Sequence, residues 1–461
     1  MKSLSFLPVA CALALAGCST EAARPTQPRP ALPAAWSAQM ESAIGNPGRW
    51  WKNFQDPQLD TLVERALQTN NDFAAAAIRV HRAQLQAALV DTNRAPSVSV
   101  DAVSAVARGF DPKFTARSSG LTSLLSFEVD LWGKLANQRK ASRWEAQATA
   151  ADCRAFAATL AGTTAKLYWQ IAYLNQLVAM ADADIDYARR TLELARTKYE
   201  VGSSSKLNAA EAELSLSTQQ AARTELVQQR TEARNALAIL FNQPPQTAGA
   251  ERSTLPEGRL PPVGPGLPAQ ILANRPDLQA AELRVREALV NVDVARTSFY
   301  PTLTLTGSLG TASSSLIRFV QNPVGTLGGD LALPFVQWNT AKLTTRIART
   351  QYEEAAVGFR QRLYTALAEV ENTLSARTQL QAEEETLRSA VEQARLAESI
   401  ARTRFEAGAT DVQLWLDAQL RVRSVERSLV ANRLTQFDNQ ADVYRALGLG
   451  IESERLNCGA S

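Results

Sequence analysis

Few residues in this sequence are of the types that carry out chemistry. Its 461 residues include one histidine, His81, which excludes a histidine-based catalytic triad and a multi-histidine metal site. The four cysteines include no pair with Cys-x-x-Cys spacing. Asp182, Asp184 and Asp186 recur within a helical pattern, which is more typical of a solvated surface than of a general acid–base pair. We therefore expect no enzyme activity, no metal and no cofactor.

The cysteine with a clear chemical role is Cys18. Lys2 and the apolar stretch at residues 4–16 are typical of a secretory signal, because the stretch is too short to span a bilayer as a mature helix. It ends in Leu15-Ala16-Gly17-Cys18, a lipobox, in which the cysteine thiol is acylated and the signal is cleaved before it. Ser19 follows, whereas an aspartate there would favour the inner membrane. The pattern predicts a signal peptide at 1–17 and a lipid anchor in the outer membrane at Cys18.

The segment after Cys18 is rich in proline, which predicts an extended tether over residues 18–48. The prolines of this tether are Pro25, Pro28, Pro30 and Pro33. Of the remaining cysteines, Cys153 lies within a predicted helix and Cys458 lies near the C-terminus. The periplasm permits a disulfide between them. The sequence leaves open whether they meet.

The chain contains the same pattern twice. Residues 195–202, Ala-Arg-Thr-Lys-Tyr-Glu-Val-Gly, correspond to residues 401–408, Ala-Arg-Thr-Arg-Phe-Glu-Ala-Gly. Residues 96–100 and 301–305 both begin with proline and then alternate polar and apolar positions. Because the period of about 205 residues is far longer than that of a solenoid, it indicates duplication of a whole unit.

Proline also separates the two units. The stretch between them cannot be regular helix because it holds Pro244, Pro245, Pro256, Pro261, Pro262 and Pro265. We predict a first repeat at 49–242, a proline-rich linker at 243–266, a second repeat at 267–448 and a C-terminal tail at 449–461.

Each repeat contains two stretches of alternating polarity, which predict strands. They lie at about 97–107, 121–132, 302–311 and 327–336. Each is long enough for a tilted strand to cross a bilayer, with an apolar face toward lipid and a polar face toward a wet lumen. A soluble sandwich with one buried face would show the same alternation.

Helices surround these strands in each repeat. A helix is predicted before the strands, at about 57–94 and 267–298, and a very long one after them, at 134–200 and 339–406. Apolar residues in the long helices are spaced alternately by four and three, which predicts a coiled-coil seam. Gly202 and Gly408 end the long helices. A further helix follows each glycine, at about 206–242 and 411–447, so each pair forms an antiparallel hairpin.

The strand count requires several copies of the chain. Four tilted strands cannot close a barrel, and open strand edges are not tolerated in lipid, so two, three or four copies must combine. The net charge is only +3, and acidic residues interrupt the basic ones. Such interleaved charge argues against nucleic-acid binding, which needs a basic surface.

Several motifs in this sequence are similar to those of the outer membrane efflux protein family, the TolC-like outer-membrane factors. The resemblance covers essentially the whole mature chain and is strongest to the NodT-type lipoproteins of resistance-nodulation-division pumps. The motifs are Trp50-Trp51-x-x-Phe54-x-Asp56-Pro57-x-Leu59, Phe127-Glu128-Val129-Asp130-Leu131-Trp132-Gly133, Arg275-Pro276-Asp277-Leu278, Phe299-Tyr300-Pro301-x-Leu303-x-Leu305-x-Gly307, Phe405-Glu406-x-Gly408 and Leu416-Asp417-Ala418-Gln419. The sequence differs from the family's pattern at Phe405, often an aromatic hydroxyl, and at Leu420, often an arginine that here comes one place later.

The resemblance implies a mainly helical fold with a membrane β-barrel. It implies a homotrimer with twelve strands that continue into a helical coiled-coil tunnel in the periplasm. The implied partners are a periplasmic adaptor (membrane fusion) protein and an inner-membrane resistance-nodulation-division pump. The function implied is a passive outer-membrane exit duct for drugs or other small toxic compounds.

The hairpin tips are the predicted periplasmic mouth, because they lie as far from the strands as the chain reaches. Tyr199, Gly202, Phe405 and Gly408 are the predicted adaptor-docking residues. In a trimer, each acidic side chain at the mouth recurs three times around one axis and attracts cations. The predicted gate consists of the acids Glu211, Asp411 and Asp417 and the bases Lys206, Arg404, Arg421 and Arg423.

Three alternatives differ in what they require. A type I protein secretion duct shares the fold, and sequence alone barely separates it from an efflux duct. A periplasmic adaptor or structural lipoprotein would normally carry one hairpin rather than two full repeats. An envelope enzyme would require a nucleophile, a metal site or paired carboxylates.

Overall fold

The computed structural model of the chain describes residues 33, 35–36, 48–245, 249, 251–263, 274–313, 323–449 and 458. The chain divides into two units, Met1–Pro33 and Ala34–Ser461, and all the elements below belong to the second unit. Cys18 and most of the predicted tether lie outside the described residues.

The described elements follow the same order in both halves. The first half contains α2 (Pro57–Thr69), α3 (Asn71–Thr92), β1 (Ser97–Phe110), β2 (Lys113–Val129), α4 (Lys134–Glu200) and α5 (Lys206–Leu240). The second half contains α7 (Pro276–Thr297), β3 (Thr302–Ser313), β4 (Pro323–Ala332), α8 (Trp338–Glu406) and α9 (Val412–Ala446). Two short 3-10 helices, η1 (Trp50–Phe54) and η2 (Pro334–Val336), precede α2 and α8.

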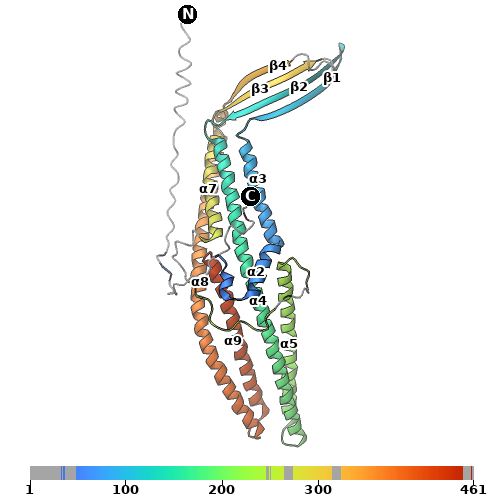
Figure 1. Ribbon diagram of the computed structural model, residues 1–461, viewed down its shortest axis with the longest axis vertical. Coiled ribbons are helices and arrows are strands. Elements are labelled where there is room, and N and C mark those ends of the chain that lie inside the picture. Colours follow the sequence, from blue (N-terminus) through green and yellow to red (C-terminus); the bar gives the residue numbers. More distant parts are fainter. Residues whose placement is uncertain are drawn as a thin grey trace. The chain divides into compact units, whose positions relative to one another are not determined.

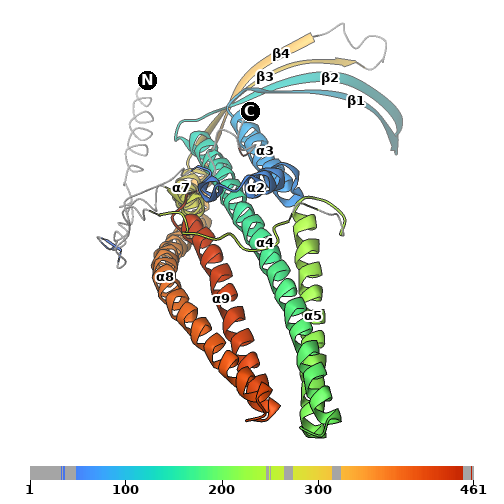
Figure 2. The ribbon, with the colours of Figure 1, turned by 60° about the horizontal axis from the view of Figure 1, so that its bottom comes forward.

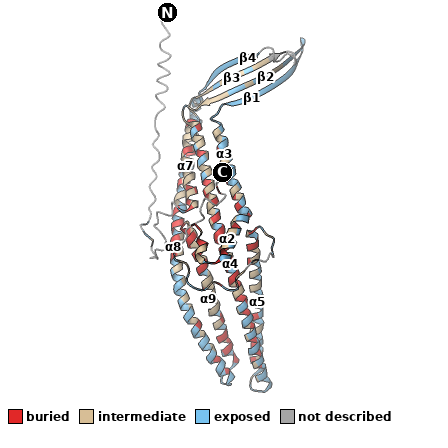
Figure 3. Cartoon of the chain, viewed as in Figure 1, coloured by how far each residue is buried: buried red, intermediate tan, exposed pale blue. Residues whose placement is uncertain are grey.

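The four strands form one antiparallel sheet in the order β1-β2-β3-β4, so β1 and β4 are its edges. The register aligns Leu125 with Gly307 and Gly307 with Leu327, which brings leucines of different strands to one face. Ser126 and Thr306 are paired on the other face. No strand side chain that the structure describes is buried (Figure 3). The sheet therefore offers an apolar and a polar face, both uncovered within one chain.

The first hairpin of the sheet is longer than predicted. β1 extends to Phe110 rather than 107, and β2 begins at Lys113 rather than near 121. Phe110 pairs with Lys113 across the turn at Asp111 and Pro112, so residues 113–120, most of which are polar or small, extend the ladder. The sequence pattern did not predict this part of the strand, because the signal for a strand is the alternation of apolar with polar side chains and this segment has few apolar ones.

Two other strand ends were also predicted incorrectly. β2 ends at Val129 rather than 132, because the Asp130 carboxylate accepts hydrogen bonds from the backbone nitrogens of Leu135 and Ala136 and so starts α4. β4 spans Pro323–Ala332 rather than 327–336. Pro334 has no N–H to donate to the ladder, and it begins η2 instead.

The first predicted helix, at 57–94, is two helices, and the residue responsible is Asn70. Its backbone is extended with ψ 127°, which ends α2. Its side chain then caps α3 by accepting a hydrogen bond from the backbone nitrogen of Phe73 at 2.9 Å. The Asn70 amide also donates to the Leu240 carbonyl at 3.1 Å, which ties this break to the end of α5.

The helices next to the strands lie in the same order as the strands. α3 packs against α4, α4 against α7, and α7 against α8. These four helices form a layer below the sheet, with α3 and α8 at its edges (Figures 1 and 2). The order follows from the connections, since α3 leads into β1, α4 follows β2, α7 leads into β3 and α8 follows β4.

The two long helices have the predicted bounds to within one residue. α4 has 67 residues and α8 has 69, so each is about 100 Å long at 1.5 Å per residue. α5 pairs with α4 and α9 pairs with α8. The two hairpin turns lie at the end of this unit that is opposite to the sheet (Figure 1).

Aromatic side chains anchor η1 to the middle of α4 and to the last turns of α9. Trp50 stacks on Tyr444 with ring centroids 5.2 Å apart, and Phe54 lies 4.9 Å from Trp169. Asp56 then caps α2 and also accepts a hydrogen bond from the Tyr168 hydroxyl at 2.9 Å. The aromatic motif near the N-terminus is thus structural, because it fixes η1 and α2 against α4 and α9.

Two further contacts close the middle of this unit. Arg275 is buried and binds Asp277 at 2.7 Å and Glu369 at 2.8 Å, which joins the start of α7 to α8. Cys153 on α4 forms a disulfide with Cys458, with Cα atoms 5.8 Å apart. The pairing that the sequence left open is therefore made.

Candidate functional site at the hairpin tips

The two hairpin turns have the same backbone geometry. Gly202 and Gly408 both have φ +75°, a left-handed conformation that glycine adopts without steric cost. The nitrogen of Ser203 donates to the carbonyl of Lys198, and the nitrogen of Ala409 donates to the carbonyl of Arg404. These bonds satisfy the last carbonyls of α4 and α8, as expected for helices that end at a left-handed glycine.

The second tip contains a buried aromatic core. Phe405, near the end of α8, is 2% exposed, and Trp415, on α9, is 3% exposed. Their ring centroids lie 5.4 Å apart. Tyr187 of α4 packs edge-on against Trp415 at 6.0 Å, so the first hairpin contributes to the core of the second.

A carboxylate joins three helices next to this core. The Glu398 side chain on α8 accepts hydrogen bonds from the Tyr187 hydroxyl at 2.5 Å and from the Trp415 ring nitrogen at 2.6 Å. Burial raises the pKa of Tyr187 to about 12, and its bond to Glu398 adds to the effect. Tyr187 is therefore a neutral donor at physiological pH, and it connects α4 to the α8–α9 hairpin.

Lys198 makes a second connection between the hairpins. Its ammonium group donates to the carbonyls of Phe405 at 2.7 Å and Glu406 at 3.2 Å. It also lies 4.7 Å from the centre of the Phe405 ring. A cation at the C-terminal end of a helix is stabilising, because the last carbonyls there carry partial negative charge.

Further from the turns, polar pairs continue the contact between α4 and α9. The Gln419 amide donates to the Thr191 hydroxyl at 3.3 Å, and both residues are buried. Arg427 pairs with Asp184 at 3.3 Å. These pairs extend the contact between the hairpins away from the tips.

The predicted gate residues occupy different surroundings. Lys206, Arg404, Arg421 and Asp411 are exposed, and Glu211 and Asp417 are partly buried. Asp417 accepts a hydrogen bond from Gln413 at 2.9 Å. Arg423 is 6% exposed and donates to Gln419, and burial lowers the pKa of its guanidinium, which Asp184 partly offsets.

Within one chain, these predicted acids and bases are not paired with each other. The structure shows no ion pair within 4.0 Å between any of the three acids and any of the four bases, all of which are described. Tyr199 is 45% exposed at the first tip, whereas Phe405 lies in the core of the second. The structure thus brings Phe405 into the interior and leaves most of the charged gate residues on the surface.

Sequence reasoning missed the residues that hold the two hairpins together. Tyr187, Glu398 and Trp415 were not selected, and neither was Lys198. A signal for two of them was present: Trp415 is the only tryptophan in the two short hairpin helices, and Glu398 interrupts apolar positions near the end of α8. Their contact could not be deduced, because it depends on how the two hairpins lie against each other.

The described residues show neither a metal site nor a membrane-spanning helix. They hold no group of three or more histidine, cysteine, aspartate or glutamate side chains that could bind a metal ion. No helix in the described ranges combines the length and apolar character needed to cross a membrane.

A sheet with an uncovered apolar face, continued by long paired helices, defines a protomer of an outer-membrane channel. The chain belongs to the outer membrane efflux protein family, whose sequence model matches residues 62–243 and 267–449.

Characterised relatives resemble the chain along its whole length. It is 31% identical to the pyoverdine export outer membrane protein OpmQ of Pseudomonas putida, over 98% of each chain. It is 28% identical to the cation efflux system protein CusC of Escherichia coli, over 98% of this chain and 100% of the relative. The chain is accordingly an outer-membrane exit duct of the efflux type, and the family is one of channels rather than enzymes.

Solved structures share the fold. The outer-membrane channel OprN superposes with a TM-score of 0.83 at 24% identity, over 92% of this chain and 99% of that one. CusC superposes with a TM-score of 0.81 at 23% identity, over 93% and 99%. The predicted combination of helical tunnel and barrel sheet is therefore confirmed as the fold.

Proposed function

We propose that three copies of the chain form one duct, which passively conducts small toxic compounds from a periplasmic adaptor and an inner-membrane resistance-nodulation-division pump to the exterior. The observation that carries the proposal is the sheet with two open edges, β1 and β4. Three sheets joined edge to edge give twelve strands, enough to close a barrel around a channel, whereas one sheet leaves its edge groups unpaired in lipid. The protein acts as a conduit and carries out no catalytic step.

The exposed residues of the sheet support placement in lipid. Leucines of three strands lie on one face, and they are exposed to the extent of 39–95% in the single chain: Leu121, Leu125, Leu305, Leu309, Leu327 and Leu331. Such a contiguous apolar surface would be unfavourable in water. Lipid chains would cover it in the membrane, and the serine and threonine face would line the lumen.

The helix layer offers matching surfaces for a neighbouring copy. Both edge helices carry exposed apolar residues at helical spacing, namely Ile78, Leu85 and Leu89 on α3 and Leu343, Ile347 and Val357 on α8. In a closed ring, α3 of one copy meets α8 of the next, just as β1 meets β4. The two seams are therefore continuous from the sheet into the helices.

The proposed gate and adaptor-docking surface lie at the hairpin tips. The acids Glu211, Asp411 and Asp417 would recur three times around the axis, and the exposed bases Lys206, Arg404 and Arg421 would contact them across copies. Arg423 is buried and donates to Gln419 of its own chain, so it would support the gate from within α9. Tyr199, Gly202 and Gly408 are exposed at the tips that the adaptor would bind, whereas the buried Phe405 supports the second tip from its interior. The absence of ion pairs between these acids and bases within the described part of one chain leaves the exposed ones, Asp411, Lys206, Arg404 and Arg421, available to a neighbouring copy.

The main experiment measures assembly. Parent protein purified in detergent is expected to contain three copies per particle by native mass spectrometry. Leu343→Asp combined with Ile347→Asp should abolish the trimer, because it places charges in an apolar seam. Leu207→Asp, at an exposed position beside the first tip, should leave the trimer intact. A parent that remains a monomer with its full strand content would contradict the proposal.

The gate is tested by single-channel conductance in planar bilayers. Asp411→Ala and Asp417→Ala should raise conductance or reduce cation preference, because each removes three carboxylates from the mouth of a trimer. Glu385→Ala, on the exposed face of α8, is the control and should change neither quantity. Unchanged conductance and selectivity in both tip variants would remove these acids from the gate.

Lipidation of Cys18 is tested by palmitate labelling of cells. Cys18→Ser should abolish incorporation of radiolabelled palmitate, because it removes the thiol that the lipobox presents. Cys153→Ser is the control and should retain the label. Label that persists in Cys18→Ser would place the anchor elsewhere.

A further inference from the structure

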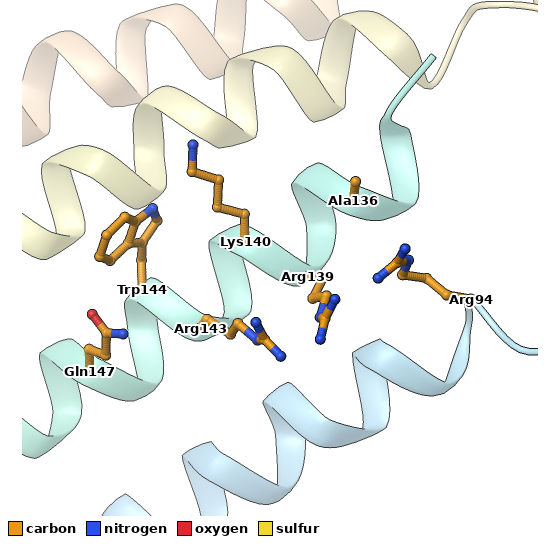
Figure 4. Close-up of a pocket in the computed structure, with 7 residues that line it drawn as sticks. All are labelled: Arg94, Ala136, Arg139, Lys140, Arg143, Trp144 and Gln147. Atoms are coloured by element: carbon orange, nitrogen blue, oxygen red, sulfur yellow. The ribbon is translucent and has the colours of Figure 1, made fainter. Parts of the chain in front are cut away.

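A cavity of about 290 Å³ lies where the helices meet the sheet, and its lining is strongly basic. Arg94 follows the end of α3, and Arg139, Lys140 and Arg143 lie in the first turns of α4. Trp144 forms an aromatic wall of the same cavity. Figure 4 shows Arg139 and Arg143 directed toward α3, and Lys140 and Trp144 on the side of α7.

The positive charge of this cavity is poorly balanced. Asp91 is the carboxylate that pairs with its arginines, at 2.7 Å from Arg139, 3.8 Å from Arg143 and 4.0 Å from Arg94. Lys140 makes no ion pair within 4.0 Å in the part of the chain that the structure describes. Three arginines thus share one carboxylate and Lys140 has none within 4.0 Å, so among the described residues the four cations of the lining exceed their paired carboxylate by a formal charge of +3 (four minus one).

The position of the cavity on α4 identifies the face to which it belongs. Arg143 lies 28 residues before Ile171, and Arg139 lies 35 residues before Leu174. Both separations are multiples of seven, so in a supercoiled helix these residues share one face. Ile171 and Leu174 are each 2% exposed, and Ile171 lines a cavity together with Leu62 of α2. The seam of α4 is therefore apolar under α2 and becomes basic near the sheet.

This face must be the outer one if the chain forms the proposed duct. η1 and α2 lie over it as a second layer, and three such layers inside the ring would obstruct the bore. Arg94 is three residues before β1, and Arg143 is nine residues after the start of α4, or about 14 Å along the helix. The cavity consequently lies on the outer surface, where the sheet leaves the membrane on its periplasmic side.

From this charge and position we infer that the cavity binds the phosphate of a phospholipid headgroup from the periplasmic leaflet of the outer membrane. Guanidinium groups bind phosphate oxygens through paired hydrogen bonds, and Lys140 supplies a further donor. Trp144 is suited to the boundary between headgroups and water, where aromatic side chains concentrate. The inference rests on the proposed function, because it requires the sheet to lie in the membrane.

The test measures lipid retained by the whole protein in detergent. Phosphatidylglycerol is added to delipidated parent and to the variant Arg139→Gln, Lys140→Gln, Arg143→Gln, and bound lipid is counted by native mass spectrometry. The variant should bind the lipid about tenfold more weakly or worse, given the contribution of each basic residue to anionic lipid binding. Lys140→Gln alone should weaken binding about threefold without disturbing any ion pair.

The matched control removes the same charge from the start of the other long helix. Lys342→Gln, Arg346→Gln, Arg349→Gln alters three exposed cations near the start of α8 and should bind lipid as the parent does. Diacylglycerol, which lacks phosphate, should not bind to the cavity. Inorganic phosphate at the same concentration should not displace phosphatidylglycerol, since it lacks the acyl chains that hold the lipid at the surface.

Three outcomes would overturn the site. They are equal lipid binding by the parent and the α4 variant, an equal loss in the α8 control, and displacement of the lipid by inorganic phosphate, which would indicate a small-anion site. The same spectra report the number of copies per particle. Particles without three copies would contradict the proposed function, whereas trimers that bind lipid equally with and without the α4 cations would contradict only the lipid site.

Discussion

The two hairpins share their backbone and differ in their interiors. Residues 206 positions apart are equivalent in the two repeats. The exposed Tyr199 thus corresponds to the buried Phe405, and Ala209 corresponds to the buried Trp415. At the first tip, the buried cluster consists of Leu192, Ala195 and Ala212. The second tip has a larger cluster that also takes in Tyr187 and Leu194 of the first hairpin. The two turns thus have the same backbone geometry, whereas the core that joins the two hairpins is built mainly from residues of the second one.

The largest expected effect comes from the core of the second tip. Trp415→Ala should lower the free energy of unfolding by about 3–5 kcal/mol, because it leaves a cavity under Phe405 and Tyr187. Tyr199→Ala at the first tip, where the ring is 45% exposed, should cost less than about 1 kcal/mol. Denaturant titration in detergent measures both. Equal losses at the two tips would show that the hairpins do not differ as described.

The next effect concerns the carboxylate between the hairpins. Glu398→Ala should cost about 2–3 kcal/mol, since it leaves the Tyr187 hydroxyl and the Trp415 ring nitrogen without their acceptor. The pKa of Tyr187 should fall below about 12, which ultraviolet titration can follow. Glu193→Ala, at an exposed position on α4, should change the stability by less than about 0.5 kcal/mol. An unchanged tyrosine titration in Glu398→Ala would contradict this contact.

A third comparison is between Asp438 of α9 and Glu232 of α5, which is the equivalent position 206 residues earlier and is exposed. Burial raises the pKa of Asp438 to about 6 from 3.8. The folded state then binds more protons than the unfolded state between these pH values, so stability falls as pH rises through this window. Asp438→Asn should be more stable than the parent by about 3 kcal/mol above pH 6 and nearly equal to it near pH 4, since each pKa unit corresponds to about 1.4 kcal/mol.

Thermal unfolding between pH 4 and pH 8 measures this difference. Glu232→Gln is the control, and its stability should follow that of the parent at every pH. A parent whose stability rises from pH 4 to pH 6 relative to Asp438→Asn would show the opposite sign and rule out a raised pKa at Asp438.

The smallest expected effect compares the cations at the ends of the long helices. Lys198→Met should cost about 1 kcal/mol, because its ammonium group binds the carbonyls at the end of α8. Arg404→Met, the equivalent position in the second repeat, should cost less than about 0.5 kcal/mol, because this side chain is exposed. The same titrations decide the comparison. A greater loss of stability in Arg404→Met than in Lys198→Met would contradict the conclusion that the cation joining the two hairpins comes from the first one.

Much of the fold was predictable, because it depends on local patterns. The seam spacing and the absence of proline defined α4 and α8, and Gly202 and Gly408 marked their ends. The break at Asn70 was missed, since asparagine both ends one helix and caps the next, and no proline marks the position. The strand segment beginning at Lys113 was missed because small polar residues give little alternation.

The tip site was predictable only in part. The sequence indicates where the turns lie, but the pairing of Glu398 with Tyr187 and Trp415 depends on contacts more than 200 residues apart as well as on local ones. Arg423 was predicted at the mouth, although the face of α9 on which it lies turns into the protein. The charge of a residue alone does not show whether its side of a helix faces solvent or packs against another helix, because the position of that helix is not known from the sequence.

The disulfide between Cys153 and Cys458 makes part of the chain a closed covalent ring. The two residues are 305 positions apart, and the ring includes both hairpin turns and the proline-rich linker. The two repeats are therefore joined by two covalent routes. A single protease cut within the linker opens the ring but leaves one molecule, and the halves separate only after the disulfide is reduced and the packing between them is unfolded.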